Sequence, residues 1–167
     1  MKVRLASELQ PDSIVDGDGI RTVIWFQGCS HNCEGCHNPQ SHDFNGGFSV
    51  ELEDIFKEID KLKYQNGITL SGGDPFFQPE AALEIAKYAH SKGFNVWSFT
   101  GFTYEQLLEL SKKKTIIKDL LDNLDVLIDG KFELKNKSFE CKYRGSSNQR
   151  IIDLNKTREN KELVLLY

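Results

Sequence analysis

The strongest constraint on the fold is the alternation of short apolar strands with amphipathic helices in a chain of 167 residues. Strands that alternate with helices predict a mostly parallel sheet joined by right-handed crossovers. A complete eightfold barrel usually requires about 250 residues, more than this chain contains. The sequence therefore predicts an α/β fold, either an incomplete (β/α) barrel or an open doubly wound sheet.

The positions of these elements also predict where chemistry should gather. Loops that follow parallel strands meet at one edge of the sheet, which here brings together a cysteine-rich loop, the turn Ser71–Pro75 and Thr100–Gly101. Ser49 is expected to cap the first helix. Strands are predicted at 21–27, 68–70, 94–99, 126–128 and 149–154, and helices at 50–62, 79–92, 104–111 and 116–121.

Composition narrows the function classes. The net charge of −4, from 21 basic and 25 acidic residues, provides no general attraction to nucleic acid. The longest apolar runs are far too short to span a membrane, and the first ten residues have no apolar signal segment. We therefore expect a cytoplasmic protein with neither a nucleic-acid nor a membrane partner. Because cytoplasmic thiols stay reduced, the four cysteines are interpreted as metal ligands or reactive groups.

Three of the cysteines form a compact motif. Cys29, Cys33 and Cys36 lie within eight residues, spaced Cys-x3-Cys-x2-Cys. A loop this tight can wrap three thiolates around one small inorganic centre. Gly28 and Gly35 remove side chains where the backbone must curl around it.

The spacing alone is compatible with more than one metal. A 4Fe–4S cluster with three cysteine ligands keeps one iron open to a substrate. Structural zinc would take a fourth ligand from His31, His37 or His42. Cys141 would close a cluster as a fourth thiolate, although its distance in sequence favours a free thiol.

Several motifs resemble a known superfamily. Cys-x3-Cys-x2-Cys after a first strand resembles the signature of radical S-adenosylmethionine enzymes. The stretch Asp16–Thr22 resembles the Asp-Gly-Pro-Gly-Ile-Arg motif of glycyl-radical activating enzymes, with Asp18 in place of proline. The turn Ser71–Pro75 resembles their Gly-Gly-Glu motif, with Asp74 in place of glutamate. Gly35 departs from the superfamily, in which an aromatic residue commonly precedes the third cysteine.

Three further blocks narrow the resemblance. The segments 97–101, 127–132 and 144–150 are similar to blocks of the activating proteins of anaerobic ribonucleoside-triphosphate reductases, and the resemblance extends from Asp16 to about Leu154. It implies a single radical S-adenosylmethionine domain over residues 1–167, with its core at about 16–154, built as an incomplete barrel.

The resemblance also implies a site. The open iron of the cluster would be chelated by the amino and carboxylate groups of S-adenosylmethionine. The glycine turn would let backbone carbonyls approach the substrate ammonium, and the backbone around Gly35–His37 would flank the adenine. No side chain is expected to act as a general base. The implied metal ligands are Cys29, Cys33 and Cys36, and the implied cofactor-binding residues are Gly35, Cys36, His37, Gly72, Gly73 and Asp74.

The implied function is activation of another enzyme. A one-electron donor such as flavodoxin would reduce the cluster, and the 5′-deoxyadenosyl radical would generate a glycyl radical on the large subunit of an anaerobic ribonucleotide reductase. Two alternatives remain within iron–sulfur chemistry: an activase of another glycyl-radical enzyme such as pyruvate formate-lyase, and a plain electron carrier. A different class is a small zinc-binding module without enzymatic activity.

Overall fold

The computed structural model describes residues 1–167 and contains one eight-stranded sheet. Its strand order is β4-β1-β3-β5-β6-β7-β8, and β2 pairs with β3 outside this path. The strands are β1 (Lys2–Leu5), β2 (Gln10–Ser13), β3 (Arg21–Phe26), β4 (Phe48–Glu51), β5 (Gly67–Gly72), β6 (Asn95–Phe99), β7 (Val126–Asp129) and β8 (Arg150–Asp153).

The centre of the sheet is parallel and its edges are antiparallel. Strands β3, β5, β6 and β7 run in one direction, whereas β1, β2, β4 and β8 pair antiparallel to their neighbours. The order of the parallel strands never reverses, so right-handed crossovers place their helices on one side. A doubly wound sheet would reverse at a switch point. The predicted incomplete barrel with a mostly parallel sheet is therefore confirmed.

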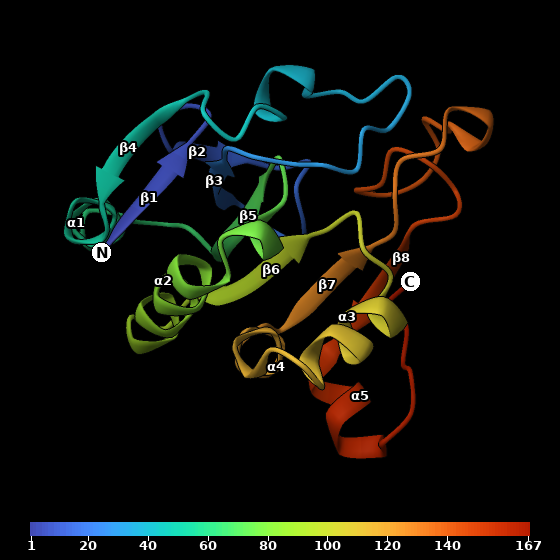
Figure 1. The fold of residues 1–167 in the computed structure, drawn as a ribbon. Coiled ribbons are helices and arrows are strands. Elements are labelled where there is room, and N and C mark those ends of the chain that lie inside the picture. Colours follow the sequence, from blue (N-terminus) through green and yellow to red (C-terminus); the bar gives the residue numbers. More distant parts are fainter.

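The helices pack against one side of this sheet, as Figure 1 shows for α2, α3 and α4. A core of 25 buried residues lies between the two layers and includes Ile24, Leu70 and Ile85. The helices are α1 (Leu52–Asp60), α2 (Pro79–Ser91), α3 (Tyr104–Ser111), α4 (Thr115–Asp122) and α5 (Leu154–Asn160), with short 3-10 helices η1 (Pro39–Ser41), η2 (Pro75–Phe77) and η3 (Leu134–Asn136).

The opposite, concave side of the sheet is more polar. Side chains alternate along a strand, so Trp97 packs in a smaller cluster apart from the main core. The Arg21 guanidinium lies 5.1 Å from the centre of the Trp97 ring, and Tyr143 packs edge-on against the same ring. The Tyr143 hydroxyl donates to Asp18 Oδ1 at 2.9 Å. These contacts fill the concave side below the carboxyl ends of the strands.

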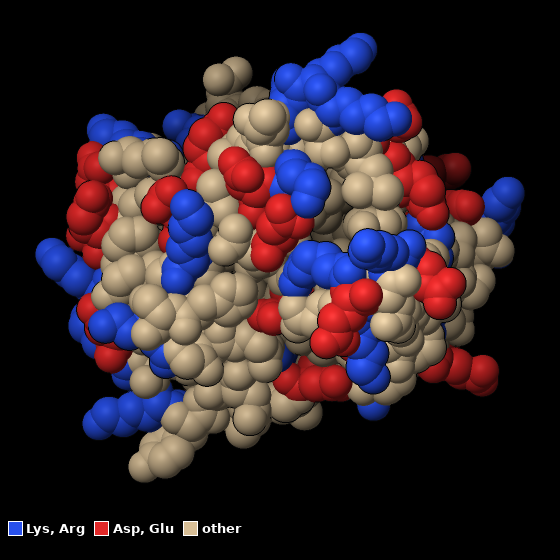
Figure 2. Space-filling view, turned by 90° about the horizontal axis from the view of Figure 1, so that it is seen from below, with Lys and Arg blue, Asp and Glu red and all other residues tan.

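The outer surface carries charges of both signs. Figure 2 shows basic and acidic side chains interspersed over the face seen from below, so that face has no patch of a single sign. None of the helices combines the length and apolar character that crossing a bilayer requires.

Most of the predicted elements are present, and one predicted cap is wrong. The expected helices at 79–92 and 104–111 correspond to α2 and α3. Ser49 does not cap a helix, because it lies in β4 and pairs with Arg4 of β1. Helix α1 begins at Leu52, and its first turn has no side-chain cap. Strands β1, β2 and β4 and helix α5 were not predicted, since they are short and largely polar.

Adjacent leucines on α3 provide a test of this packing. Leu107 is fully buried, whereas Leu108 is 38% exposed. We expect Leu107→Ala to lower the free energy of unfolding by about 2–5 kcal/mol because it leaves a cavity. The matched variant Leu108→Ala should lower it by no more than about 1 kcal/mol. Urea denaturation followed by circular dichroism measures both, and equal losses would contradict the described inner face of α3.

Candidate metal and cofactor site

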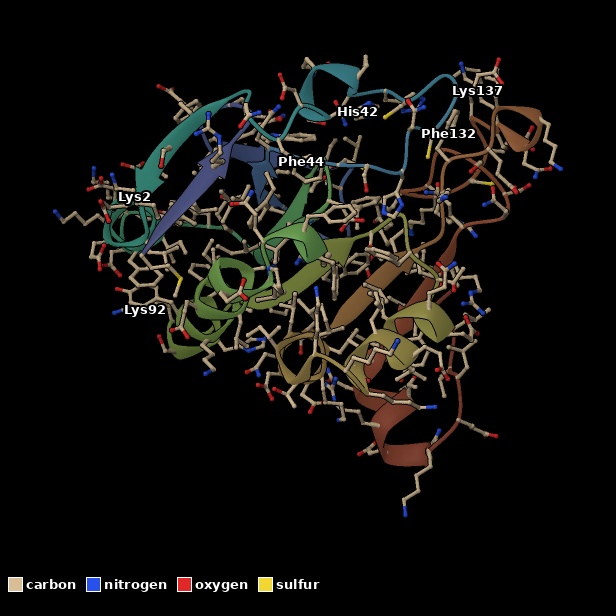
Figure 3. The ribbon with its side chains drawn as sticks, viewed as in Figure 1. Lys2, His42, Phe44, Lys92, Phe132 and Lys137 are labelled. Atoms are coloured by element: carbon tan, nitrogen blue, oxygen red, sulfur yellow. The ribbon has the colours of Figure 1, made fainter.

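A cavity of about 620 Å³ opens at the carboxyl ends of the parallel strands. The cysteine loop after β3, the glycine turn after β5 and Thr100–Gly101 after β6 all line it. The three loops that the sequence predicted to meet at one edge do meet there. Figure 3 shows His42 and Phe132 at this edge, whereas Lys2 and Lys92 lie at the other end of the molecule.

The cysteine loop is held at its base by backbone hydrogen bonds. The Gly28 N–H donates to the carbonyl of Ser41 at 2.7 Å, and the Cys29 N–H donates to the carbonyl of His42 at 3.0 Å. Gly28 has φ +112°, a conformation that side chains disfavour. The loop therefore leaves β3 sharply and returns beside its own start. All three cysteines of the motif line the cavity.

Burial disfavours negative charge on the thiols of Cys29 and Cys33. It raises the pKa of Cys29 to about 11, although the backbone N–H of His31 acts in the opposite direction. Burial also raises the pKa of Cys33, against a backbone hydrogen bond from Phe132. Metals bind cysteine as the thiolate, so a bound cation would favour the deprotonated form and displace protons. The thiols of Cys29 and Cys33 therefore need a nearby cation, such as a metal, to ionise at neutral pH.

The donor set fits an iron–sulfur cluster better than a single ion. Zinc lies about 2.3 Å from each ligand sulfur, so its ligands converge on one point. No three side chains among histidine, cysteine, aspartate and glutamate converge in this way. His42 does approach Cys36, with 3.3 Å between Nε2 and Sγ. Three soft thiols that line one cavity without converging on a point suit a larger iron–sulfur centre.

The glycine turn is packed directly against the base of the cysteine loop. Gly72 has φ +98°, and a Cβ there would lie 2.3 Å from the carbonyl oxygen of Phe26. A Cβ on Gly73 would lie 2.5 Å from the carbonyl oxygen of Gly28. Both glycines line the cavity with backbone atoms alone. Close packing of two loops, as well as access to a ligand, therefore requires glycine at these positions.

Asp74 lies beneath the cavity rather than in its wall. Its side chain is fully buried and is surrounded by protein donors. One carboxylate oxygen accepts from the Phe76 N–H at 2.9 Å and so caps η2. The other accepts from the Thr100 hydroxyl and the Gly101 N–H, each at 2.9 Å, and contacts His31 Nε2 at 2.7 Å. Asp74 therefore caps η2 and joins the loops around the cavity from below.

The remaining predicted residues divide into two groups. Cys36 and His37 line the cavity, and the His37 ring lies 4.9 Å from the ring of Phe132, centre to centre. Gly35 turns the loop with φ +73°, and a Cβ there would lie 3.1 Å from Leu134. Gly35 therefore permits contact between the cysteine loop and the segment 131–149.

The segment 131–149 forms a wall of the cavity that was not predicted from the sequence. Cys141 and Tyr143 line the same cavity as the motif cysteines. Gln149 shapes this wall, because its Oε1 accepts from the backbone N–H groups of Gly145 and Ser146. The signals in the sequence that pointed to this region were the blocks at 127–132 and 144–150, and Cys141 as a possible fourth thiolate.

Comparisons with known proteins agree with this arrangement. The family described as 4Fe-4S single cluster domain matches residues 15–152. The chain is 34% identical over 147 residues to the anaerobic ribonucleoside-triphosphate reductase-activating protein of Pasteurella multocida, covering 83% of this chain and 90% of that protein. It is 36% identical over 123 residues to the pyruvate formate-lyase-activating enzyme of Clostridium pasteurianum, covering 70% of this chain and 51% of that enzyme.

Among solved structures, QueE from Escherichia coli has a similar fold. The TM-score is 0.52 at 16% identity, over 62% of this chain and 54% of that chain. This likeness concerns the fold alone. The open barrel, the cavity with three thiols and the matched residues together define a 4Fe–4S single cluster domain. Within that class, the chain belongs to the family of anaerobic ribonucleoside-triphosphate reductase-activating proteins.

Cysteine variants test the ligand set directly. We expect Cys33→Ala to abolish cluster assembly, because two thiolates cannot hold three corners of a cubane. Cys29→Ala and Cys36→Ala should behave in the same way. Iron and sulfide per chain, measured after anaerobic reconstitution, check this expectation.

Cys141→Ala is the matched control, since Cys141 lines the same cavity outside the motif. It should retain the iron and sulfide content of the unaltered chain. Normal cluster content in Cys33→Ala, or its loss in Cys141→Ala, would contradict the proposed ligands.

Proposed function

We propose that this chain activates an anaerobic ribonucleotide reductase by generating a glycyl radical on its large subunit. In this proposal Cys29, Cys33 and Cys36 hold a 4Fe–4S cluster, and S-adenosylmethionine binds beside it. The observation that carries the proposal is the meeting of the three thiols and the Gly72–Gly73 backbone in one cavity. We further infer that residues 1–167 act as one domain in the cytoplasm, where thiols stay reduced.

The cofactors supply the redox chemistry. With a 4Fe–4S cluster held by Cys29, Cys33 and Cys36 and S-adenosylmethionine beside it, the bound cofactors would supply one-electron reductive cleavage of the sulfonium and abstraction of a hydrogen atom from a glycine Cα of the partner. A one-electron donor of the flavodoxin type would provide the electron. The protein contributes binding, orientation and exclusion of competing hydrogen donors.

The chain's own residues provide a place for the nucleoside sulfonium. A volume of about 620 Å³ is within the usual range of about 300–1,000 Å³ for small-molecule sites. Gly72 and Gly73 expose backbone next to the thiols, which suits a substrate ammonium group. Cys36 and His37, with the neighbouring Gly35, form the wall assigned to the adenine. Asp74 supports these loops from below.

The composition of the cavity rim favours a protein as the substrate. Ile14, Val15 and Phe139 line the mouth with exposed apolar side chains, Phe139 being 92% exposed. Exposed apolar groups around an open site are typical of surfaces that bind another protein. The sheet is not closed, so the cavity is accessible to a loop of a partner.

A second candidate within the same chemistry is activation of pyruvate formate-lyase. The similarity to the Clostridium pasteurianum enzyme supports it, but the chain spans about half of that enzyme and 90% of the Pasteurella multocida reductase-activating protein. The extent of the match therefore favours the reductase. The match of residues 15–152 to a 4Fe-4S single cluster domain argues against the zinc-module alternative.

One experiment separates these candidates. The chain is reconstituted anaerobically with iron and sulfide, reduced with a strong one-electron donor, and supplied with S-adenosylmethionine and a partner. We expect 5′-deoxyadenosine to form and the glycyl radical to be detected by electron paramagnetic resonance on an anaerobic ribonucleotide reductase large subunit. Pyruvate formate-lyase serves as the matched partner control.

The outcomes are distinct. A radical on pyruvate formate-lyase alone would transfer the proposal to the second candidate. No 5′-deoxyadenosine from a fully loaded cluster would overturn radical chemistry altogether.

A further inference from the structure

His31 lies in the middle of the cysteine loop, but its side chain is directed into the protein. The imidazole is only 7% exposed. Its ring centre lies 4.6 Å from that of Phe102, edge-on, and 5.4 Å from that of Phe77. The His31 imidazole is therefore packed between two aromatic rings, which restricts the position of this part of the cysteine loop.

A buried carboxylate holds the polar end of this imidazole. His31 Nε2 lies 2.7 Å from Asp74 Oδ2, and the same oxygen accepts from the Thr100 hydroxyl and the Gly101 N–H. A charge removed from water requires such donors. The carboxylate therefore joins the cysteine loop to the ends of β5 and β6.

The backbone of His31 lies beside the thiol of Cys29. Its N–H faces the sulfur closely enough to lower the pKa of Cys29, against the effect of burial. Hydrogen bonds to ligand sulfurs are among the factors that set the potential of an iron–sulfur cluster. The side chain of His31 thus contacts the buried Asp74, and its backbone lies beside the sulfur of Cys29.

The packing around His31 leaves no spare room. A Cβ on Gly101 would lie 2.3 Å from the imidazole Cδ2. Gly101 can therefore donate its N–H to Asp74 while the imidazole lies against it.

We propose that His31 is a positioning residue that, anchored by Asp74, fixes the Cys29 sulfur and tunes the reduction potential of the cluster. The inference rests on the proposed function, because it assumes that the loop holds a 4Fe–4S cluster. It places Asp74 in the role of anchor for the metal loop, acting on Cys29 through His31.

Three histidine variants test the proposal. His31→Leu removes the contact with Asp74, whereas His31→Gln keeps an N–H donor at a similar reach. The control is His90→Leu, because His90 forms an equally short contact with Asp125, 2.7 Å from Nε2 to Oδ2, and lines no part of the cavity. Each protein is reconstituted anaerobically, and two quantities are measured: the rate of iron loss to a chelator and the reduction potential of the cluster.

We expect His31→Leu to lose iron about tenfold faster or more, the usual effect of removing an outer-sphere partner. Its potential should fall, because a weakened N–H bond to the sulfur stabilises the reduced cluster less. His31→Gln should recover most of both properties, and His90→Leu should match the unaltered chain.

Gly101→Ala tests the same contact from the opposite side. It retains both His31 and Asp74 but pushes the imidazole away, so it should shift both measurements in the same direction as His31→Leu. Far-ultraviolet circular dichroism of each apoprotein verifies that the fold is intact.

The inference and the proposed function fail differently. A His31→Leu protein with unchanged iron loss and unchanged potential would overturn the role of His31 alone. An unaltered chain that assembles no 4Fe–4S cluster would overturn the proposed function and this inference with it.

Discussion

A buried carboxylate with no access to water must find all its partners within the protein, and the arrangement of this site depends on that requirement. Asp74 takes its donors from three separate segments: η2, the end of β6 and the cysteine loop. These segments would otherwise be independent loops at the edge of a sheet. Because one side chain binds all three, the thiols, the glycine turn and the strand ends keep a common geometry.

The direction of the parallel strands explains why those segments are neighbours at all. Each crossover from β3 through β7 is made on the same side, so successive carboxyl ends lie next to one another along a curved edge. The concave side carries a smaller apolar cluster around Trp97, together with polar side chains such as Arg21. In Figure 1 the loops that follow β6 and β7 extend toward the cysteine segment at this edge. Fold and chemistry are thus coupled by topology rather than by any single motif.

Sequence reasoning predicted the parts of this protein that have strong local signals. Helix α3 and strand β5 follow clear apolar periodicity, and the resemblance carried by the cysteine motif pointed to the cluster class. It failed where distant segments compete with local preference, as at Ser49, which pairs with β1 instead of capping a helix. It also could not relate His31 to Asp74, which are 43 positions apart, because only the folded chain brings their side chains together.

The barrel is not closed, and its open side is held by side-chain contacts. No strand pairing joins β8 to the other edge of the sheet. On the concave side, the Tyr143 hydroxyl donates to Asp18 Oδ1 at 2.9 Å. A single such bond contributes only about 1 kcal/mol net, far less than a ladder of backbone pairs. The open side of the barrel is therefore held by weaker contacts than the paired strands of its wall.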